Sequence, residues 1–264
     1  MTSVPVFRVA AEKLVGGGDG AGDGDGGRIR LDGPEGRHAA LVRRLQPGER
    51  VNLTDGAGRL AECVVRGSDG QALDLDVLER RSVPPPDPRV TVVQALPKGD
   101  RGETAVETMT EIGVDVIVPW SASRSITQWR GDRGEKALAK WRSTAAEASK
   151  QSRRVWWPQV AEAATTAQVA RLVGAAGLAA VLHEDAESSL AELTPEQLAA
   201  GGPASDTTGG IVLIVGPEGG ISPEELRAFT EAGGVSYRMG PTVLRTSTAG
   251  TAAAAVLLAR SGRW

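Results

Sequence analysis

The run Ile211–Val215 is the clearest hydrophobic pattern in the chain, because its residues are all aliphatic and polar loops flank it. A short run of this kind is typical of a central strand in a parallel sheet, where both faces are buried. Downstream, Ser222, Pro223 and Glu225 have the spacing of a helix N-cap, a first helical residue and a capping-box glutamate. The pattern therefore predicts a strand, a glycine-bearing turn and a helix in quick succession.

Apolar strands alternate with amphipathic helices through most of the remaining chain. We expect further strands at 90–96, 114–118 and 178–182, and helices at 103–112 and 133–154. An alanine-rich helix follows and ends near Arg260, with Thr246, Ser247 or Thr248 as its N-cap. Its small side chains favour close packing against another element or a second copy of the chain. Strands that alternate with helices predict an α/β domain with a parallel sheet.

The first part of the chain has a different pattern. Residues 73–77 alternate strictly between apolar and polar, as a half-buried strand does, and 55–58 form a turn between two further strands. A short helix places His38, Leu41, Val42 and Leu45 on one face. These features predict a small β-barrel-like module. Residues 16–27 contain repeated glycine and aspartate, which favours a flexible loop over a calcium-binding repeat because the repeat's aliphatic positions are absent.

A proline-rich stretch marks the boundary between these two patterns. Proline is unsuited to strand interiors and makes a chain stiff and extended. We therefore predict a first domain at 1–83, a linker at 84–88 and a second domain at 89–264.

Three glycines, Gly216, Gly219 and Gly220, make the loop after 211–215 a candidate binding site. The loop has neither the Gly-Lys-Ser/Thr ending of a phosphate-binding loop nor a Gly-x-Gly-x-x-Gly fingerprint. Glu218 in its middle would repel a phosphate. The loop therefore favours a phosphate-free nucleoside, and S-adenosylmethionine, which carries positive charge, fits this description. A tight strand-to-helix turn without a ligand is the alternative reading.

Composition narrows the class of protein. The chain has 264 residues and a net charge of −3, which suits a globular protein, and we expect it to be cytoplasmic. A single cysteine and two distant histidines exclude a disulfide and disfavour a metal site. No apolar run is long enough for a membrane span, and no signal peptide is expected. The segment 124–154 holds nine basic and three acidic residues, which is compatible with nucleic-acid binding or with a solvated helix face.

Several segments, taken in order, resemble one family. They are 96–100, 111–114, 123–125, 147–153, 215–220 and 244–246. In this order they are similar to the RsmE-type 16S ribosomal RNA (uracil-N3) methyltransferases of the SPOUT class. Phe7, Arg8 and the segment 38–45 resemble that family's PUA-like RNA-binding domain. Two positions depart from the family pattern: Ser247 replaces a glutamate and Thr108 replaces a lysine.

The resemblance implies a fold and a site. The fold would be a knotted parallel-sheet SPOUT domain with a small N-terminal PUA-like β-barrel, acting as a homodimer. Three loops would hold S-adenosylmethionine, and their candidate residues are Leu182, His183, Glu184, Gly216, Glu218, Gly219, Gly220, Ile221, Met239, Gly240, Leu244, Thr246, Ser247 and Ala249. The substrate would be a uracil of 16S rRNA in the small ribosomal subunit, methylated at N3.

Arg245 and Glu218 are the candidate catalytic residues. Arg245 would hold RNA phosphate or a uracil carbonyl, or form a structural ion pair instead. Glu218 would bind the amino group of the cofactor's methionine or help to place uracil, or only complement a helix dipole. His183 follows a strand and is either a ligand-facing or a core histidine. The candidate phosphate-binding residues are Arg8, Arg43, Arg44, Lys98, Arg101, Arg124 and Arg153.

Two other functions stay open. Ribose 2′-O methylation is chemically related, and an RNA-binding ribosome assembly factor without catalytic activity could share the fold. The cofactor's binding and the position of the methyl group distinguish them.

Overall fold

The computed structural model describes residues 4–15, 27–199 and 209–264. The predicted glycine–aspartate loop and most of the polar loop before 211 lie outside these ranges. The chain divides into two compact units: Met1–Pro85 with Ser149–Trp157, and Pro86–Ala148 with Pro158–Trp264.

The first unit is built on a five-stranded sheet with the order β1-β3-β4-β5-β2. β1 pairs parallel with β3, and the other pairs are antiparallel. The alternation predicted at 73–77 is confirmed, because Leu73, Leu75 and Val77 are buried while Asp74 and Asp76 are not. The elements are β1 Val6–Arg8, a 3-10 turn Ala11–Lys13, β2 Arg28–Leu31, α1 Gly33–Arg37, β3 Arg50–Thr54, β4 Arg59–Ser68 and β5 Leu73–Ser82.

The short helix in this unit departs from its predicted face. α1 continues into a wider π-helical turn, His38–Val42, in which the Arg43 N–H donates to the His38 carbonyl. Leu41 and Val42 are exposed, whereas Ala39 and Leu45 are buried. The prediction of one shared apolar face was wrong because a π-turn changes which residues lie above one another.

The segment after the longest helix also packs within the first unit. The Trp157 N–H donates to the Gly56 carbonyl at 2.9 Å, and the Thr54 hydroxyl donates to the Val155 carbonyl at 3.2 Å. Gly58 approaches Trp156 so closely that a Cβ there would lie 2.5 Å from the indole ring. The turn predicted at 55–58 therefore forms the surface on which residues 155–157 pack.

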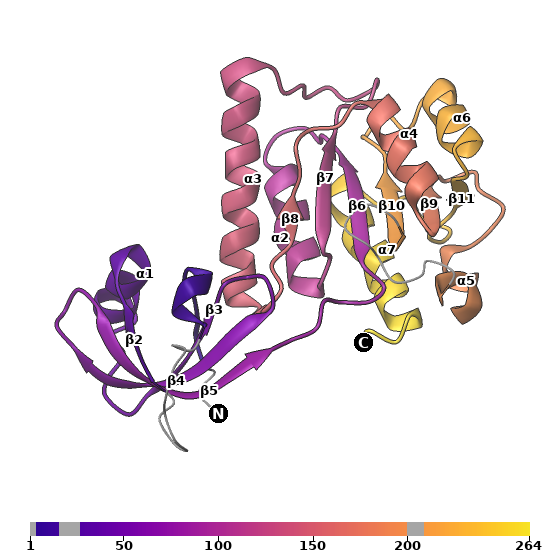
Figure 1. Cartoon of the computed structure of the whole chain (residues 1–264). Coiled ribbons are helices and arrows are strands. Elements are labelled where there is room, and N and C mark those ends of the chain that lie inside the picture. Colours follow the sequence, from indigo (N-terminus) through magenta and orange to yellow (C-terminus); the bar gives the residue numbers. More distant parts are fainter. Residues whose placement is uncertain (1–3, 16–26, 200–208) are drawn as a thin grey trace. The chain divides into compact units, whose positions relative to one another are not determined.

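The second unit has a six-stranded, fully parallel sheet with the order β11-β9-β10-β6-β7-β8 (Figure 1). Buried residues of α2, α3 and α7 pack on one face, and those of α4 and α6 pack on the other. The strands are β6 Val90–Ala95, β7 Val116–Trp120, β8 Gln159–Val160, β9 Leu178–Leu182, β10 Ile211–Val215 and β11 Val235–Tyr237. The helices are α2 Arg101–Ile112, α3 Gly131–Gln151, α4 Thr166–Ala175, α5 Pro195–Ala199, α6 Pro223–Glu231 and α7 Thr246–Arg260, with a 3-10 turn at Leu190–Glu192.

This architecture confirms the predicted fold class, an α/β domain on a parallel sheet with a small β domain before it. β7 begins two residues later than predicted, because the Val114 N–H closes the end of α2 by donating to the Met109 carbonyl. The N-cap of α7 is Arg245 rather than Thr246, Ser247 or Thr248, and no side chain caps it. Its carbonyl accepts from the N–H groups of Thr248 and Ala249, so the helix starts earlier.

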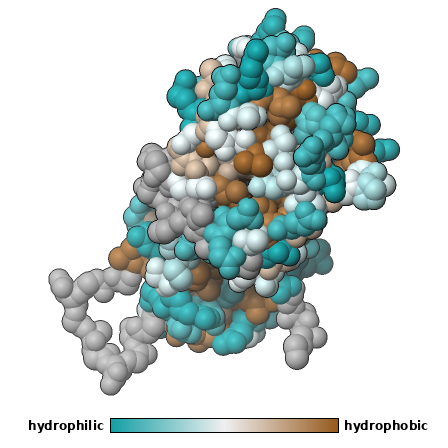
Figure 2. Space-filling view, turned by 90° about the vertical axis from the view of Figure 1, so that its right-hand side faces the viewer, coloured by the Kyte–Doolittle hydropathy of each residue, from teal (hydrophilic) through white to brown (hydrophobic). Residues whose placement is uncertain are grey.

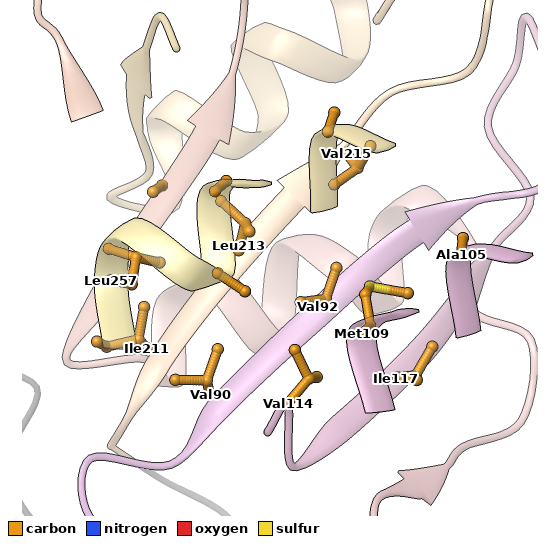
Figure 3. Packing of buried hydrophobic residues seen from close by; sticks show 14 of the residues in the cluster. Val90, Val92, Ala105, Met109, Val114, Ile117, Ile211, Leu213, Val215 and Leu257 are labelled. Atoms are coloured by element: carbon orange, nitrogen blue, oxygen red, sulfur yellow. The ribbon is translucent and has the colours of Figure 1, made fainter. Parts of the chain in front are cut away.

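The core under α2 and α7 shows why α7 is rich in small residues. Val92 of β6, Leu213 of β10 and Leu257 of α7 converge there with Met109 of α2 (Figure 3). A Cβ on Gly250 would lie 3.0 Å from the Met109 sulfur. The predicted close packing of this helix is therefore confirmed, and the element it packs against lies within the chain.

A largely buried ion pair, in which the Arg263 side chain is 14% and the Asp115 side chain 8% exposed, attaches the residues after α7 to the sheet. The Arg263 Nη1 atom lies 2.6 Å from Asp115 Oδ2, and the Val90 N–H donates to the same oxygen at 2.9 Å. Arg263 also donates to the carbonyls of Pro88 and Gly113. The pair therefore joins the start of β6 and the end of α2 to the segment after α7.

We predict that Asp115→Ala lowers the free energy of unfolding by about 3 kcal/mol or more, because it leaves the Arg263 charge buried without its partner. Glu162→Ala is the control, since Glu162 pairs with Arg142 at the surface and is 79% exposed. Its effect should stay below about 1 kcal/mol. Denaturant unfolding of both variants measures the difference. Equal losses would contradict the role given to the buried pair.

Candidate functional site

A cavity of about 870 Å³ lies in the second unit, at the carboxyl ends of three neighbouring parallel strands. The loops that follow β9, β10 and β11 form its walls, and Arg101 and Arg124 complete them. Ligands of open α/β sheets bind at this edge, where loops from adjacent strands converge. The volume lies within the range of small-molecule and cofactor sites.

The structure brings together nearly all the predicted cofactor-binding residues. Those that line the cavity are Leu182, His183, Glu184, Gly216, Glu218, Gly219, Gly220, Ile221, Met239, Gly240, Leu244, Thr246 and Ala249. Ser247 does not line it. Arg245, Arg101 and Arg124 do, whereas Lys98 contributes a backbone contact to Glu218.

The glycine loop after β10 is shaped by packing against the protein. A Cβ on Gly216 would lie 2.8 Å from Ile221 Cγ1, and one on Gly219 would lie 3.2 Å from Arg124 Cβ. Gly220 has a φ of +73° and its N–H donates to the Pro217 carbonyl. These glycines therefore permit a tight turn and close contact with neighbouring residues, which leaves the loop backbone at the cavity wall.

Glu218 has partners within the protein. Its Oε1 atom accepts from the Lys98 N–H at 3.2 Å and lies 3.4 Å from Arg101 Nη1. The side chain is 28% exposed, so solvent weakens this long ion pair. The carboxylate still borders the cavity, and Glu184 and Asp185 also line it.

The four arginines of the cavity wall differ in how they are held. Arg101 pairs with Glu218, Arg124 donates to the Gly219 carbonyl at 3.2 Å, and Arg238 donates to the carbonyls of Ala186 and Glu187. Within the part of the chain that the structure describes, no hydrogen bond or ion pair engages the exposed Arg245 guanidinium. Arg245 is therefore the wall cation that is free to meet a ligand.

His183 follows β9 and Tyr237 ends β11, and both residues line the cavity. The His183 N–H donates to the Tyr237 carbonyl, and His183 Nδ1 accepts from the Asp185 N–H at 3.2 Å. Burial raises the pKa of the Tyr237 phenol above its ordinary value, so this phenol is neutral near pH 7. Among the described residues, the His183 side chain does not pair with a carboxylate.

Apolar side chains give the cavity its remaining surface. Leu182, Ile221 and Leu244 were expected there, but Val215 and Leu226 were not. Val243 of the third predicted loop also lines the cavity. Val243 is 80% exposed, so an apolar side chain stands at the rim. The face of the second unit that carries α5, α6 and β11 shows hydrophobic patches among hydrophilic residues (Figure 2). Tyr237, which ends β11, and Arg238, which follows it, were also missed, because this short strand was not predicted.

The other candidate phosphate-binding residues, Arg8, Arg43, Arg44 and Arg153, belong to the first unit. Arg43, Arg44 and Arg153 are exposed. The Arg8 guanidinium lies 4.9 Å from the centre of the Trp157 ring, which is a cation–π contact. Among the described residues there is no cluster of three or more metal-ligating side chains, and no helix has the length and hydropathy that a bilayer requires.

Comparisons with known proteins define the class. Residues 84–258 match the model of an RNA methyltransferase domain, and residues 31–78 match that of an RNA methyltransferase PUA domain. The class is thus an RNA methyltransferase with an accompanying PUA domain.

Curated relatives define the family within this class. "Ribosomal RNA small subunit methyltransferase E" of Mycobacterium bovis is 46% identical over 238 residues, which cover 89% of this chain and 87% of the relative. The protein of that name from Bacillus subtilis is 26% identical and covers 83% of this chain and 85% of its own length. The chain belongs to the ribosomal RNA small subunit methyltransferase E family, as the resemblance implied.

A solved structure agrees with this fold. The Neisseria gonorrhoeae ribosomal RNA small subunit methyltransferase E, bound to S-adenosyl methionine, superposes with a TM-score of 0.77 at 23% identity. The match covers 99% of this chain and 98% of that one.

We predict that Gly216→Ala destabilises the second unit by about 1–3 kcal/mol, because the new methyl group would overlap Ile221. Gly240→Ala is the matched control: it also lines the cavity, but nothing lies within 4 Å of its Cβ position and its φ is ordinary. Denaturant unfolding of both variants measures the change. If Gly240→Ala were as destabilising as Gly216→Ala, the packing account of the loop would fail.

Proposed function

We propose that this protein transfers the methyl group of S-adenosylmethionine to N3 of a uracil in 16S rRNA of the small ribosomal subunit. The observation that carries the proposal is the convergence of three strand-end loops on one cavity of about 870 Å³ in a chain of this family. The names of the relatives support ribosomal RNA as the substrate. The cofactor named for the Neisseria gonorrhoeae protein supports S-adenosylmethionine.

The residues of the cavity fit this cofactor. Leu182, Ile221 and Leu244 offer apolar surface for an adenine ring. Glu184, Asp185 and Glu218 offer negative charge to a sulfonium and an amino group. When bound, the cofactor supplies an electrophilic methyl group. The carbonyl and N–H groups of the loop 216–221 are placed at the wall and can bind the nucleoside part.

Arg245 is the residue that we assign to the substrate. Uracil N3 must lose its proton before it can act as a nucleophile, so negative charge develops on N3 and its neighbouring carbonyls. A guanidinium that has no partner among the described residues can stabilise this charge by two parallel hydrogen bonds. Its position as the N-cap of α7 fixes the backbone from which it extends.

The remaining parts of the proposal concern partners and place. The PUA domain would bind RNA with Arg8, Arg43 and Arg44, and Lys98, Arg101, Arg124 and Arg153 would contact further phosphates. The domains would be 1–83 and 89–264, joined by the linker 84–88. A cytoplasmic homodimer is part of the same proposal, and sedimentation of the purified protein tests the dimer.

The direct test supplies purified protein and methyl-labelled S-adenosylmethionine to small ribosomal subunits that lack the modification. We expect label in 16S rRNA, recovered as N3-methyluridine by mass spectrometry of digested RNA. Label on a ribose 2′-oxygen would show that the protein methylates ribose instead of uracil N3. Cofactor binding without any label would favour an assembly factor, and absence of cofactor binding would defeat the proposal.

Arg245→Ala should lower kcat for methyl transfer about 10²-fold, as the loss of one charge-stabilising donor does in other enzymes, while cofactor affinity changes little. Arg227→Ala is the control, because Arg227 is exposed on α6 and does not line the cavity. Single-turnover rates on unmodified subunits measure the effect. An Arg245→Ala rate equal to that of the control would remove Arg245 from the catalytic role.

A further inference from the structure

A buried carboxylate at the start of α6 joins three separate segments of the second unit. Glu225 is 4% exposed. Its Oε1 atom accepts from the Ser123 N–H at 2.8 Å and from the Thr166 hydroxyl at 3.0 Å, and its Oε2 atom accepts from the Ser222 N–H at 3.1 Å. The partners lie in the loop after β7, at the start of α4 and at the start of α6.

All three partners of Glu225 are donors. The N–H groups of Ser123 and Ser222 can only donate. The Trp120 Nε1 atom donates to the Thr166 oxygen at 3.2 Å, which leaves the hydroxyl hydrogen of Thr166 to point toward Glu225. A carboxylate satisfies this arrangement, whereas an amide at this position would turn an N–H toward another donor. Among the described residues no cation pairs with Glu225, so the donors alone compensate its burial.

These contacts hold two walls of the cavity at a fixed spacing. Ser222 directly follows the glycine loop, and Ser123 directly precedes Arg124. Arg124 in turn donates to the Gly219 carbonyl and packs against Gly219. The glycine loop, 216–221, and the loop that contains Arg124 are therefore connected at two points, once through Glu225 and once through Arg124 itself.

A second capping box in the same unit shows what capping alone requires. At the start of α4, Thr165 and Gln168 form the same reciprocal pair, and both are exposed. Within the described part of the chain, the hydrogen bonds of the Gln168 side chain stay within its own turn. Glu225 has the same local role but adds bonds to Ser123 and Thr166, so its burial and its charge go beyond capping.

We propose that Glu225 is a positioning residue for the reaction, which locks the glycine loop to the loop of Arg124 and so sets the width of the cofactor site. The proposal rests on the function proposed above, because it assigns the locked walls to S-adenosylmethionine. Glu225 itself does not line the cavity and acts through Ser123 and Ser222.

The first test compares Glu225→Gln with Ser222→Ala. Both weaken the cap of α6, but Ser222→Ala keeps the bonds of Glu225 to Ser123 and Thr166. We expect Glu225→Gln to weaken S-adenosylmethionine binding about tenfold or more, as the loss of a hydrogen bond to a charged group does. It should also speed hydrogen exchange of the Ser222 or the Ser123 amide, because the new NH2 group must face one of these two donors. Ser222→Ala should leave cofactor binding and Ser123 exchange within about twofold.

The second test is a double-mutant cycle on cofactor affinity. If Glu225 acts through the loop of Arg124, the losses in Glu225→Gln and Arg124→Ala will not add. The comparison pair is Glu225→Gln with Arg238→Ala, since Arg238 anchors a different loop of the wall. Those losses should add. Additive losses in both cycles, or unchanged exchange at both Ser123 and Ser222 in Glu225→Gln, would overturn the proposal.

Two controls keep the outcomes separate. If Glu225→Gln fails to fold, Glu225→Asp takes its place, because it keeps the charge but draws the oxygens back from Ser123 by one methylene. If the wild-type protein fails to bind S-adenosylmethionine in titration calorimetry, the proposed function fails, whereas exchange at Ser123 and Ser222 still tests the contacts. If the wild type binds and Glu225→Gln binds equally well, only the positioning role fails.

Discussion

The parallel ladder around β10 is the constraint on which the rest of the structure depends. β10 pairs with β9 on one side and β6 on the other, and all five of its residues are buried. Because neighbouring parallel strands run in the same direction, their following loops leave the sheet at the same edge. The cavity is therefore a consequence of strand order. Because β11, β9 and β10 are adjacent, three loops that are distant in sequence form the walls of one cavity.

The sequence predicted the elements whose pattern is local. Val181 and Leu213 belong to continuous apolar runs, and the strands they define were predicted with their observed limits. The capping box of Ser222 and Glu225 was also read correctly, because it needs only a spacing of three residues. The fold class followed from the alternation of strands and helices.

Elements decided by tertiary contacts escaped prediction. β11 has three residues and pairs with β9 alone, so its pattern is too short to recognise. α4 has an ordinary helical pattern but follows a loop of small residues. Its two buried valines, Val169 and Val173, are recognised as core residues only once the helix packs on the sheet. The π-turn at His38 has no sequence signal that differs from that of an α-helix.

The site shows the same division. The glycine loop was found from its composition, whereas the other two loops came from the resemblance, since nothing in 182–184 or 239–249 alone marks a ligand site. The double role of Glu225 could not be read from sequence, because Ser123 and Thr166 are 102 and 59 residues away from it along the chain. Only the folded sheet brings these donors to one carboxylate.

The narrow seam between α2 and α7 restricts how this chain can diverge. Gly250 leaves 3.0 Å between its Cβ position and the Met109 sulfur and 3.3 Å to the Gln94 amide oxygen. A larger residue at 250 fits only if 109 or 94 shrinks in the same lineage. In homologous sequences, a larger residue at one of these three positions should therefore accompany a smaller residue at another, so that their summed side-chain volume stays nearly constant.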